Sequence, residues 1–151
     1  MPFNGHETVV ESVIDRIKQS RLIDEFVFAT SDNPEDKIFT AITQRAHINL
    51  VRGDENDVVA RMQKAIGSLD IRPDVIVRVC SDNPLLMPSL VDESISQLID
   101  AKADVVTPFE TNSYPFGLSL VVMTTDCLER IDVEADDTLS REHVENFCFD
   151  H

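Results

Sequence analysis

The stretch Val75–Leu86, VIVRVCSDNPLL, contains the features from which the fold class is predicted. Its first half is almost entirely Val, Ile and Cys, which is typical of a strand buried on both faces in a parallel sheet. Pro84 cannot continue a strand ladder and disfavours helical geometry at Asn83, so we expect the strand to stop near Ser81. Asp82 then lies at the carboxyl end of the strand, where open α/β sheets bind their ligands.

On both sides of this strand, apolar residues recur alternately with helical and with strand-like spacing. The expected strands are Phe26–Thr30, Ile48–Val51, Val75–Cys80, Asp104–Thr107 and Leu118–Thr124. The expected helices are Thr8–Leu22, Pro34–Ala46, Asp54–Leu69, Pro88–Ala103, Asp126–Ile131 and Asp136–Phe149. This alternation predicts an α/β protein with a largely parallel sheet flanked by helices. At 151 residues the chain is expected to form a single domain, residues 1–151.

Two local signals refine these boundaries. Asn33 is a plausible N-cap, with Pro34 in the first turn and Asp36 beside the positive end of the helix dipole. The buried face of that helix is expected to consist of Ile38, Phe39, Ile42 and Ala46. In the expected helix Asp54–Leu69, the apolar residues in register are Val58, Val59, Met62 and Ile66. The pair Arg52-Gly53 is expected to close the preceding strand in a tight turn.

The charge of the chain excludes some partners. It carries 28 acidic against 13 basic residues, a formal charge of −15, and its Lys and Arg residues form no stripe. This argues against a nucleic-acid or anionic-membrane partner, although an acidic surface by itself indicates only good solvation. No apolar run approaches the length of a membrane span, and the start MPFNGHETVV has no signal-peptide pattern.

The cysteines point to a reducing compartment. Cys80, Cys127 and Cys148 are an odd number without CxxC spacing, which favours reduced core thiols over a disulfide framework. We therefore predict a soluble, cytoplasmic protein. A zinc site formed by His143, Cys148 and His151 is not expected, because positions five apart on one continuous helix point roughly 140° away from each other. No GxSxG elbow supports a hydrolase.

Five segments in order resemble the cytidylyltransferases of sugar activation, in the branch of spore-coat polysaccharide biosynthesis protein F, which is related to the CMP-sugar-acid synthetases. The segments are FVFATSDNPED, VRGDENDVVARMQKA, DVIVRVCSDNPLLMPSLVDESI, SYPFGLSLVVM and LSREHV. The resemblance implies a Rossmann-like nucleotide-diphospho-sugar transferase fold. It also implies attack of a sugar or sugar-acid hydroxyl on the α-phosphate of CTP, with Mg²⁺ as cofactor and pyrophosphate released.

The resemblance also implies roles for particular residues. Asp82 matches the aspartate that ligates Mg²⁺ in this family, a hard cation that takes one or two carboxylates plus phosphate oxygens. The alternative is an aspartate that merely forms an Asx-turn before Pro84. Residues implied near the nucleotide are Arg52, Gly53, Asp57, Arg61, Ser81 and Asn83. For Asp57 and Arg61 the alternative is a surface ion pair at i,i+4 spacing, worth a few tenths of a kcal/mol.

On the sugar side, the resemblance implies Tyr114, Gly117, Arg141 and His143. Arg141 would hold a sugar carboxylate or phosphate through a bidentate contact. The alternative for Arg141 and His143 is an ordinary helix start capped after Asp136-Asp137, and both explanations stay open here.

The sequence also departs from the family. The usual N-terminal strand and its glycine-rich phosphate loop have no counterpart, so we expect a domain incomplete at the N-terminus and possibly at the C-terminus. Phe116, Ser119 and Val121 stand where relatives often have acidic residues. We therefore keep two functions, a cytidylyltransferase of weak or no activity and a non-catalytic homologue that binds a nucleotide, a sugar or a protein. Exposed strand edges make a homodimer a reasonable expectation.

Overall fold

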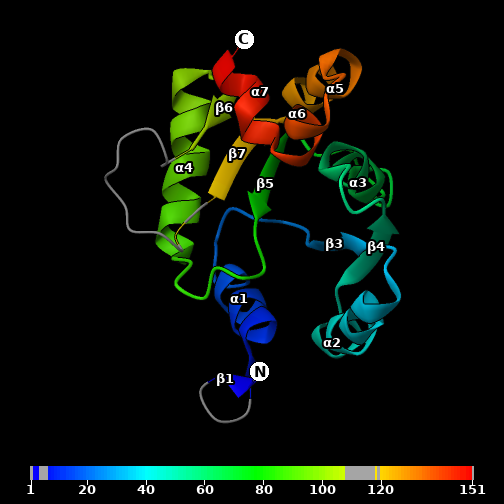
Figure 1. Cartoon of the computed structure of the whole chain (residues 1–151). Coiled ribbons are helices and arrows are strands. Elements are labelled where there is room, and N and C mark those ends of the chain that lie inside the picture. The colour runs from blue at the N-terminus through cyan, green and yellow to red at the C-terminus, as the bar shows by residue number, and fades with distance from the viewer. Residues whose placement is uncertain (1, 4–6, 108–117, 119, 151) are drawn as a thin grey trace. The chain divides into compact units, whose positions relative to one another are not determined.

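The computed structural model describes residues 2–3, 7–107, 118 and 120–150 (Figure 1). These residues divide into two compact units, described separately below. Unit 1 comprises Met1–Asp24 and Val75–Thr124, and unit 2 comprises Glu25–Asp74 and Thr125–His151. Helices and strands alternate in both, which confirms the predicted α/β class.

Unit 1 combines a small sheet with two helices and an N-terminal hairpin. Its elements are β1 (Pro2–Phe3), β2 (Glu7–Thr8), α1 (Val9–Ile17), β5 (Val75–Val79), α4 (Pro88–Ala101), β6 (Val105–Val106) and β7 (Leu120–Thr124). The sheet order is β5-β7-β6, with Val77 opposite Val122. β7 runs antiparallel to both neighbours, which the prediction of a largely parallel sheet did not include. An antiparallel strand can join a sheet without a crossover helix, so the order of helices and strands along the chain did not predict the direction of β7.

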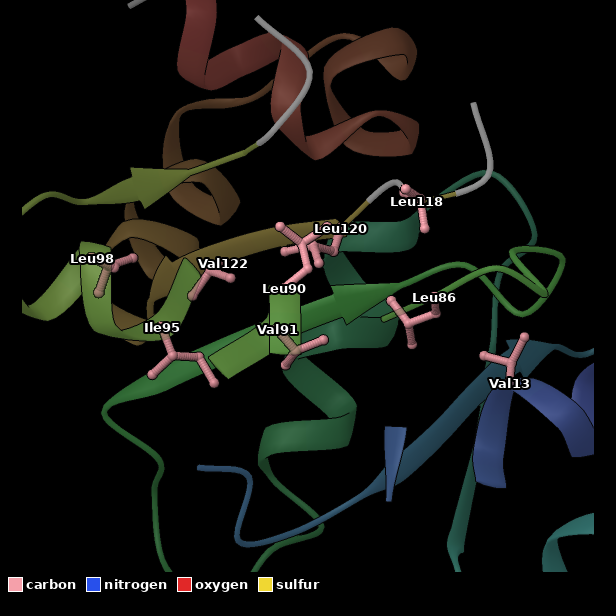
Figure 2. Packing of buried hydrophobic residues seen from close by; sticks show 9 residues of the cluster. All are labelled: Val13, Leu86, Leu90, Val91, Ile95, Leu98, Leu118, Leu120 and Val122. Carbon is pink, nitrogen blue, oxygen red and sulfur yellow. The ribbon is translucent and has the colours of Figure 1, made fainter. Parts of the chain in front are cut away.

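The core of unit 1 lies between α4 and this sheet (Figure 2). Its buried residues are Val13, Leu86, Leu90, Val91, Ile95, Leu98, Leu118, Leu120 and Val122. The prediction that β5 is buried on both faces is wrong, because every residue of β5 is only half-buried. In the described part of the chain β5 is an edge strand, so one of its sides has no neighbouring strand to cover it. It also ends at Val79, one residue before Cys80, the last residue of the expected strand.

Unit 2 is built on the parallel pair β3–β4 and on α3. Its elements are β3 (Val27–Ser31), η1 (Pro34–Lys37), α2 (Ile38–Ala46), β4 (Asn49–Gly53), α3 (Val58–Ile66), α5 (Thr125–Glu134), α6 (Thr138–Glu142) and α7 (Val144–Asp150). α3 packs against both strands and against α5 and α6. Of the four apolar residues predicted in register on α3, Val59 and Met62 are buried, while Val58 and Ile66 are half-buried.

Several expected boundaries in unit 2 are corrected. Asn33 occupies the N-cap position, but its side chain makes no capping hydrogen bond, and the first turn is a 3₁₀ helix. Ile38 is 65% exposed, so it does not belong to the buried face. Arg52-Gly53 continues β4 instead of forming a turn, because Gly53 pairs with Ser31 of β3.

The C-terminal segment is not one helix. α6 ends at Glu142, and α7 begins at Val144. His143, with φ −112° and ψ 81°, breaks the helix between them. None of the helices within the described ranges is long and apolar enough to cross a membrane.

Candidate functional site

The carboxyl ends of β3 and β4 form one polar edge in unit 2. The two strands are parallel and in register, with Thr30 opposite Arg52 and Ser31 opposite Gly53. The chain leaves β3 through Asp32, whose amide donates to the Gly53 carbonyl at 2.8 Å. Parallel pairing therefore brings the polar residues after each strand to the same edge.

Asp36 is the acceptor at the centre of this edge. Its Oδ2 accepts hydrogen bonds from the Thr30 hydroxyl at 2.7 Å, the Ser31 hydroxyl at 2.6 Å and the Ser31 amide at 3.1 Å. The hydrogen bond from the Ser31 hydroxyl, followed by that from Thr30, holds the pKa of the Asp36 carboxyl below its usual value. From the sequence, Asp36 was expected only to lie beside the helix dipole. The available signal for its hydrogen bonds was the pair of hydroxyl residues, Thr30 and Ser31, six and five positions before it.

Arg52 fixes the turn that follows β3. Its Nε donates to the Ser31 carbonyl at 3.1 Å and its Nη2 to the Asn33 carbonyl at 2.6 Å. The Asn33 side chain in turn donates to Glu55 Oε2 at 2.9 Å. A guanidinium suits this task because its donors lie in a fixed planar fork.

Gly53 and Arg61 are brought into contact. A methyl group on Gly53 would lie 3.0 Å from Arg61 Cγ, so a larger residue would displace the arginine side chain. Arg61 Nη1 donates to the carbonyls of Asp54 and Glu55, the latter at 2.6 Å. Arg61 therefore lies across the loop that leads from β4 into α3.

Asp57 caps α3 and also pairs with Arg141. One carboxylate oxygen accepts from the Ala60 amide at 2.9 Å, and the other accepts from Arg141 Nε at 2.9 Å. Partial burial pushes the pKa of the Asp57 carboxyl upward, but the hydrogen bonds from Arg141 and Ala60 outweigh it, and the pKa is lowered. The helix begins at Val58 and not at Asp54, because the Asp54 carboxylate accepts from the Asn56 amide in an Asx-turn.

Arg141 joins three parts of unit 2. Besides Asp57, it contacts Asp132 through Nη2 to Oδ1 at 2.8 Å, and its Nη1 donates to the carbonyls of Asp132 and Ala135 at 3.2 Å each. The Asp57 and Asp132 carboxylates raise the pKa of the guanidinium. The structure thus gives Arg141 a positioning role that sequence reasoning missed. The exposed His143 lies directly after α6.

In unit 1, the residues after β5 form a compact turn. The Asn83 amide donates to the Cys80 carbonyl at 3.2 Å, and the Leu86 amide donates to the Asn83 carbonyl at 3.2 Å. Asn83 and Leu86 are buried, Ser81 is half-buried, and Asp82 is exposed. The turn thus presents the Asp82 carboxylate to solvent at the carboxyl end of the strand.

A magnesium ion is compatible with Asp82. Within the described ranges, the Asp82 carboxylate makes no hydrogen bond, and no cluster of three or more His, Cys, Asp or Glu residues is arranged for a metal. Mg²⁺ needs no such cluster, because it is commonly held by one or two carboxylates while water and substrate phosphates supply the remaining oxygens. An exposed carboxylate without internal partners fits that mode of binding.

The expected site residues fall into three groups. Ser81, Asp82 and Asn83 lie together in unit 1. The second group lies in unit 2 and consists of Arg52, Gly53, Asp57, Arg61, Arg141 and His143. Two pairs in it are in contact, Gly53 with Arg61 and Asp57 with Arg141. Tyr114 and Gly117 lie outside the described residues.

Comparison with known proteins gives consistent matches. The profile of the cytidylyltransferase family matches residues 2–149. An uncharacterised protein of Methanocaldococcus jannaschii is 32% identical over 147 residues, which cover 97% of this chain and 58% of that protein. Spore coat polysaccharide biosynthesis protein SpsF of Bacillus subtilis is 29% identical over 152 residues, which cover 97% of this chain and 61% of that protein.

A solved structure supports the fold. The chain matches a cytidylyltransferase from Leptospira borgpetersenii serovar Hardjo-bovis with a TM-score of 0.86 at 23% identity. The match covers 95% of this chain and 60% of that chain. The present chain therefore spans about three fifths of the length of the proteins it matches.

Proposed function

Because the chain belongs to the cytidylyltransferase family, we propose that it acts in transferring CMP from CTP to a sugar or sugar acid, with release of pyrophosphate. The observation that carries the proposal is the exposed Asp82 at the end of β5 in a chain matched by this family from residue 2 to residue 149. The Bacillus subtilis relative is named for spore coat polysaccharide biosynthesis, which supports a sugar acceptor in surface polysaccharide biosynthesis.

Asp82 is the proposed magnesium ligand. When bound, Mg²⁺ supplies charge neutralisation for the phosphates during nucleotidyl transfer. The part of this chain is to present one exposed carboxylate, held in place by the two backbone hydrogen bonds of the Asn83 turn. Ser81 and Asn83, on either side, are proposed to line the nucleotide.

Arg52 and Arg61 are the proposed phosphate contacts of unit 2, beside Gly53 and Asp57. Both guanidinium groups are already positioned by backbone carbonyls, through Nε and Nη2 of Arg52 and through Nη1 of Arg61. Within the described ranges, Nη1 of Arg52 and Nη2 of Arg61 donate to no protein group. Those remaining N–H groups are suited to an anionic ligand, since a guanidinium carries five donors.

The sugar contacts are proposed to involve Tyr114, Gly117, Arg141 and His143. Arg141 uses Nε, Nη1 and Nη2 inside unit 2, so a sugar carboxylate would have to compete with Asp57 and Asp132 for it. His143 is exposed, and within the described ranges its side chain makes no hydrogen bond or ion pair that a sugar would have to displace. We therefore rank His143 above Arg141 as a direct sugar contact.

A nucleotide- or sugar-binding homologue without activity is the second candidate, and one observation favours it. Val121, which stands where the resemblance implies an acidic residue, is 1% exposed on β7. A carboxylate at such a position would be buried in an apolar core, so this strand provides no second metal ligand at that position. We propose that the chain by itself has weak activity or none, and acts as part of a longer protein or with a partner.

Titration calorimetry with CTP, UTP and ATP in the presence of Mg²⁺ tests the proposed site. We expect CTP to bind selectively and only with the metal, and Asp82→Asn to weaken that binding at least about tenfold, about 1.4 kcal/mol. Asp32→Asn is a matched control, because Asp32 is an exposed aspartate in the same tetrapeptide, Ser-Asp-Asn-Pro, after β3. Equal CTP binding by the parent chain and Asp82→Asn would refute the magnesium assignment.

Pyrophosphate release from CTP in the presence of sugar and sugar-acid acceptors distinguishes the two candidate functions. Turnover by this chain alone would contradict the second candidate, and Asp82→Asn should then remove most of the rate. Metal-dependent CTP binding without turnover would support the binding homologue. No binding to any of the three nucleotides would contradict the first candidate and would leave, of the second, only a homologue that binds a sugar or a protein.

A further inference from the structure

Arg16 of α1 is hydrogen-bonded to the turn that carries Asp82. Its Nη1 donates to the Leu86 carbonyl at 3.3 Å, although 70 positions separate the two residues in the chain. Both α1 and the turn belong to unit 1, so the contact is a property of that unit alone. The sequence pattern and the family resemblance assigned no role to Arg16.

The Leu86 carbonyl depends on Arg16 for its hydrogen bond. Met87 is the N-cap of α4 and its carbonyl accepts from the Leu90 amide at 3.0 Å, whereas the Leu86 carbonyl lies one residue before the cap, outside the helix. Leu86 is fully buried, and within the described ranges only Arg16 donates to its carbonyl. A buried carbonyl that loses its donor costs free energy comparable to a hydrogen bond. Arg16 therefore stabilises the end of this turn.

The helix that carries Arg16 is held on both sides of it. Val13, one helical turn before Arg16, is buried in the same core cluster as Leu86 (Figure 2). After the end of α1, the Arg21 amide donates to the Asp92 carboxylate of α4 at 3.1 Å. The helix is thus held to the core before Arg16 and to α4 after it, so the guanidinium reaches the turn from a fixed support.

The hydrogen bond to Leu86 is linked to Asp82 through a short, stiff segment. The Leu86 amide donates to the Asn83 carbonyl and the Asn83 amide donates to the Cys80 carbonyl, both at 3.2 Å. Pro84, between them, has its φ angle fixed by its ring. A displacement of Leu86 is therefore transmitted to Asn83, the residue next to Asp82.

We propose that Arg16 is a positioning residue for the magnesium carboxylate: through the Leu86 carbonyl, it holds the Asp82 turn in the geometry that binds Mg²⁺ together with CTP. This inference rests on the proposed function, because Asp82 is the metal ligand proposed there. Arg16 acts on the backbone of the turn and not on the metal or the nucleotide itself.

Hydrogen exchange of the ligand-free protein tests whether Arg16 holds the turn. Arg16→Met removes the donor and keeps a long, unbranched side chain. We expect protection of the Asn83 and Leu86 amides to fall about two- to tenfold, the range that one hydrogen bond supports. The Asp36 amide, which makes the corresponding bond in the turn after β3, is the internal reference. Arg21→Met is the matched control, because it removes the same charge from an exposed arginine just beyond α1 and should change none of these amides.

Titration calorimetry with CTP and Mg²⁺ tests whether this turn serves the metal. Arg16→Met should weaken metal-dependent CTP binding about two- to tenfold, and Arg21→Met should not weaken it. In the Asp82→Asn background, Arg16→Met should weaken binding no further, because the carboxylate that Arg16 positions is already gone. A purely structural role would instead lower the free energy of unfolding in urea and leave the CTP affinity of the folded protein unchanged.

The outcomes separate this inference from the proposed function. No CTP binding by the parent chain, or equal binding by Asp82→Asn, would contradict the proposed magnesium and CTP site and the inference with it. If Asp82→Asn weakens binding but Arg16→Met does not, only the inference is overturned.

Two further results would also overturn the inference alone. They are an equal loss from Arg16→Met with and without the Asp82 carboxylate, which would mean independent action, and unchanged exchange of the Asn83 and Leu86 amides. If Arg16→Met does not fold, Arg16→Gln takes its place in every measurement, because its shorter side chain withdraws the donor from the Leu86 carbonyl while it remains polar.

Discussion

The tetrapeptide Ser-Asp-Asn-Pro occurs twice, after β3 as Ser31–Pro34 and after β5 as Ser81–Pro84, and the two copies are held by different forces. Both make the same backbone hydrogen bond, in which the asparagine carbonyl accepts from the amide three residues later, at 3.1 Å from Asp36 and at 3.2 Å from Leu86. In both copies the aspartate is exposed. The four residues therefore determine the backbone turn and the outward direction of the aspartate.

The difference arises two residues after the proline. After β3 this residue is Asp36, whose carboxylate returns to the strand end and accepts from Thr30 and Ser31. After β5 it is Leu86, which is fully buried in the core of unit 1 (Figure 2). The turn after β3 is stabilised by charge-assisted hydrogen bonds, and the turn after β5 is stabilised by burial of an apolar side chain.

This difference bears on function. At the second turn, Asp82 is exposed, and its carboxylate makes no hydrogen bond within the described part of the chain. At the first turn, the polar groups around Asp36 satisfy one another. The exposed aspartate is common to both turns, and the two turns differ in the residue two positions after the proline, a carboxylate at the first turn and a buried leucine at the second.

Shortening the Leu86 side chain should cause the largest loss of stability. Leu86→Ala removes a fully buried side chain from the core and should lower the free energy of unfolding by about 2–5 kcal/mol. Leu85→Ala is the matched control, because Leu85 is 52% exposed, and it should change stability by less than about 0.5 kcal/mol. Urea unfolding measures both. Equal losses would show that burial of Leu86 is not what fastens the second turn.

Neutralising Asp36 should have a smaller effect. Asp36→Asn replaces charge-assisted hydrogen bonds from Thr30 and Ser31 by neutral ones, with an expected loss of about 1–2 kcal/mol. Glu35→Gln is the control, since Glu35 is an exposed acidic residue in the same turn of η1. Urea unfolding again gives the difference. A variant at position 36 as stable as the control would mean that the carboxylate does not fasten the first turn.

Structural features that depend on neighbouring residues in the chain could be predicted from the sequence. The strand end before Pro84 and the outward Asp82 follow from proline chemistry, and the apolar spacing of α3 identified its buried Val59 and Met62. The continuation of β4 through Gly53 was missed because it depends on pairing with Ser31, which lies on another strand. Strand partners are not encoded in a short window of sequence.

The site was less predictable than the fold for the same reason. The sequence offered Asp57 and Arg61 as a pair on one helix face, whereas the structure pairs Asp57 with Arg141, 84 residues away in the chain. Residues of such wide separation are brought together by packing of α3, α5 and α6, and local patterns do not contain that information.

Low pH should destabilise the turn after β3 more than the turn after β5, and this is the smallest of the expected changes in stability. The pKa of Asp36 is depressed in the folded state, so its stabilising contribution is complete above the unfolded value of about 3.9 and is lost as the pH falls through the lower, folded value. The Ser31 amide donates to this carboxylate at 3.1 Å, whereas the Leu86 amide donates to a carbonyl, which does not titrate.

Hydrogen exchange of single amides measures this difference. Below about pH 4, protection of the Ser31 amide should fall several-fold relative to that of the Leu86 amide, because protonation of Asp36 removes a charged acceptor. The Asp36 amide is an internal control, because it belongs to the same turn and donates to the Asn33 carbonyl. In Asp36→Asn the extra acid sensitivity of Ser31 should disappear. A parallel loss at Ser31 and Leu86 would instead indicate global opening, and the two turns would then not be fastened by different forces.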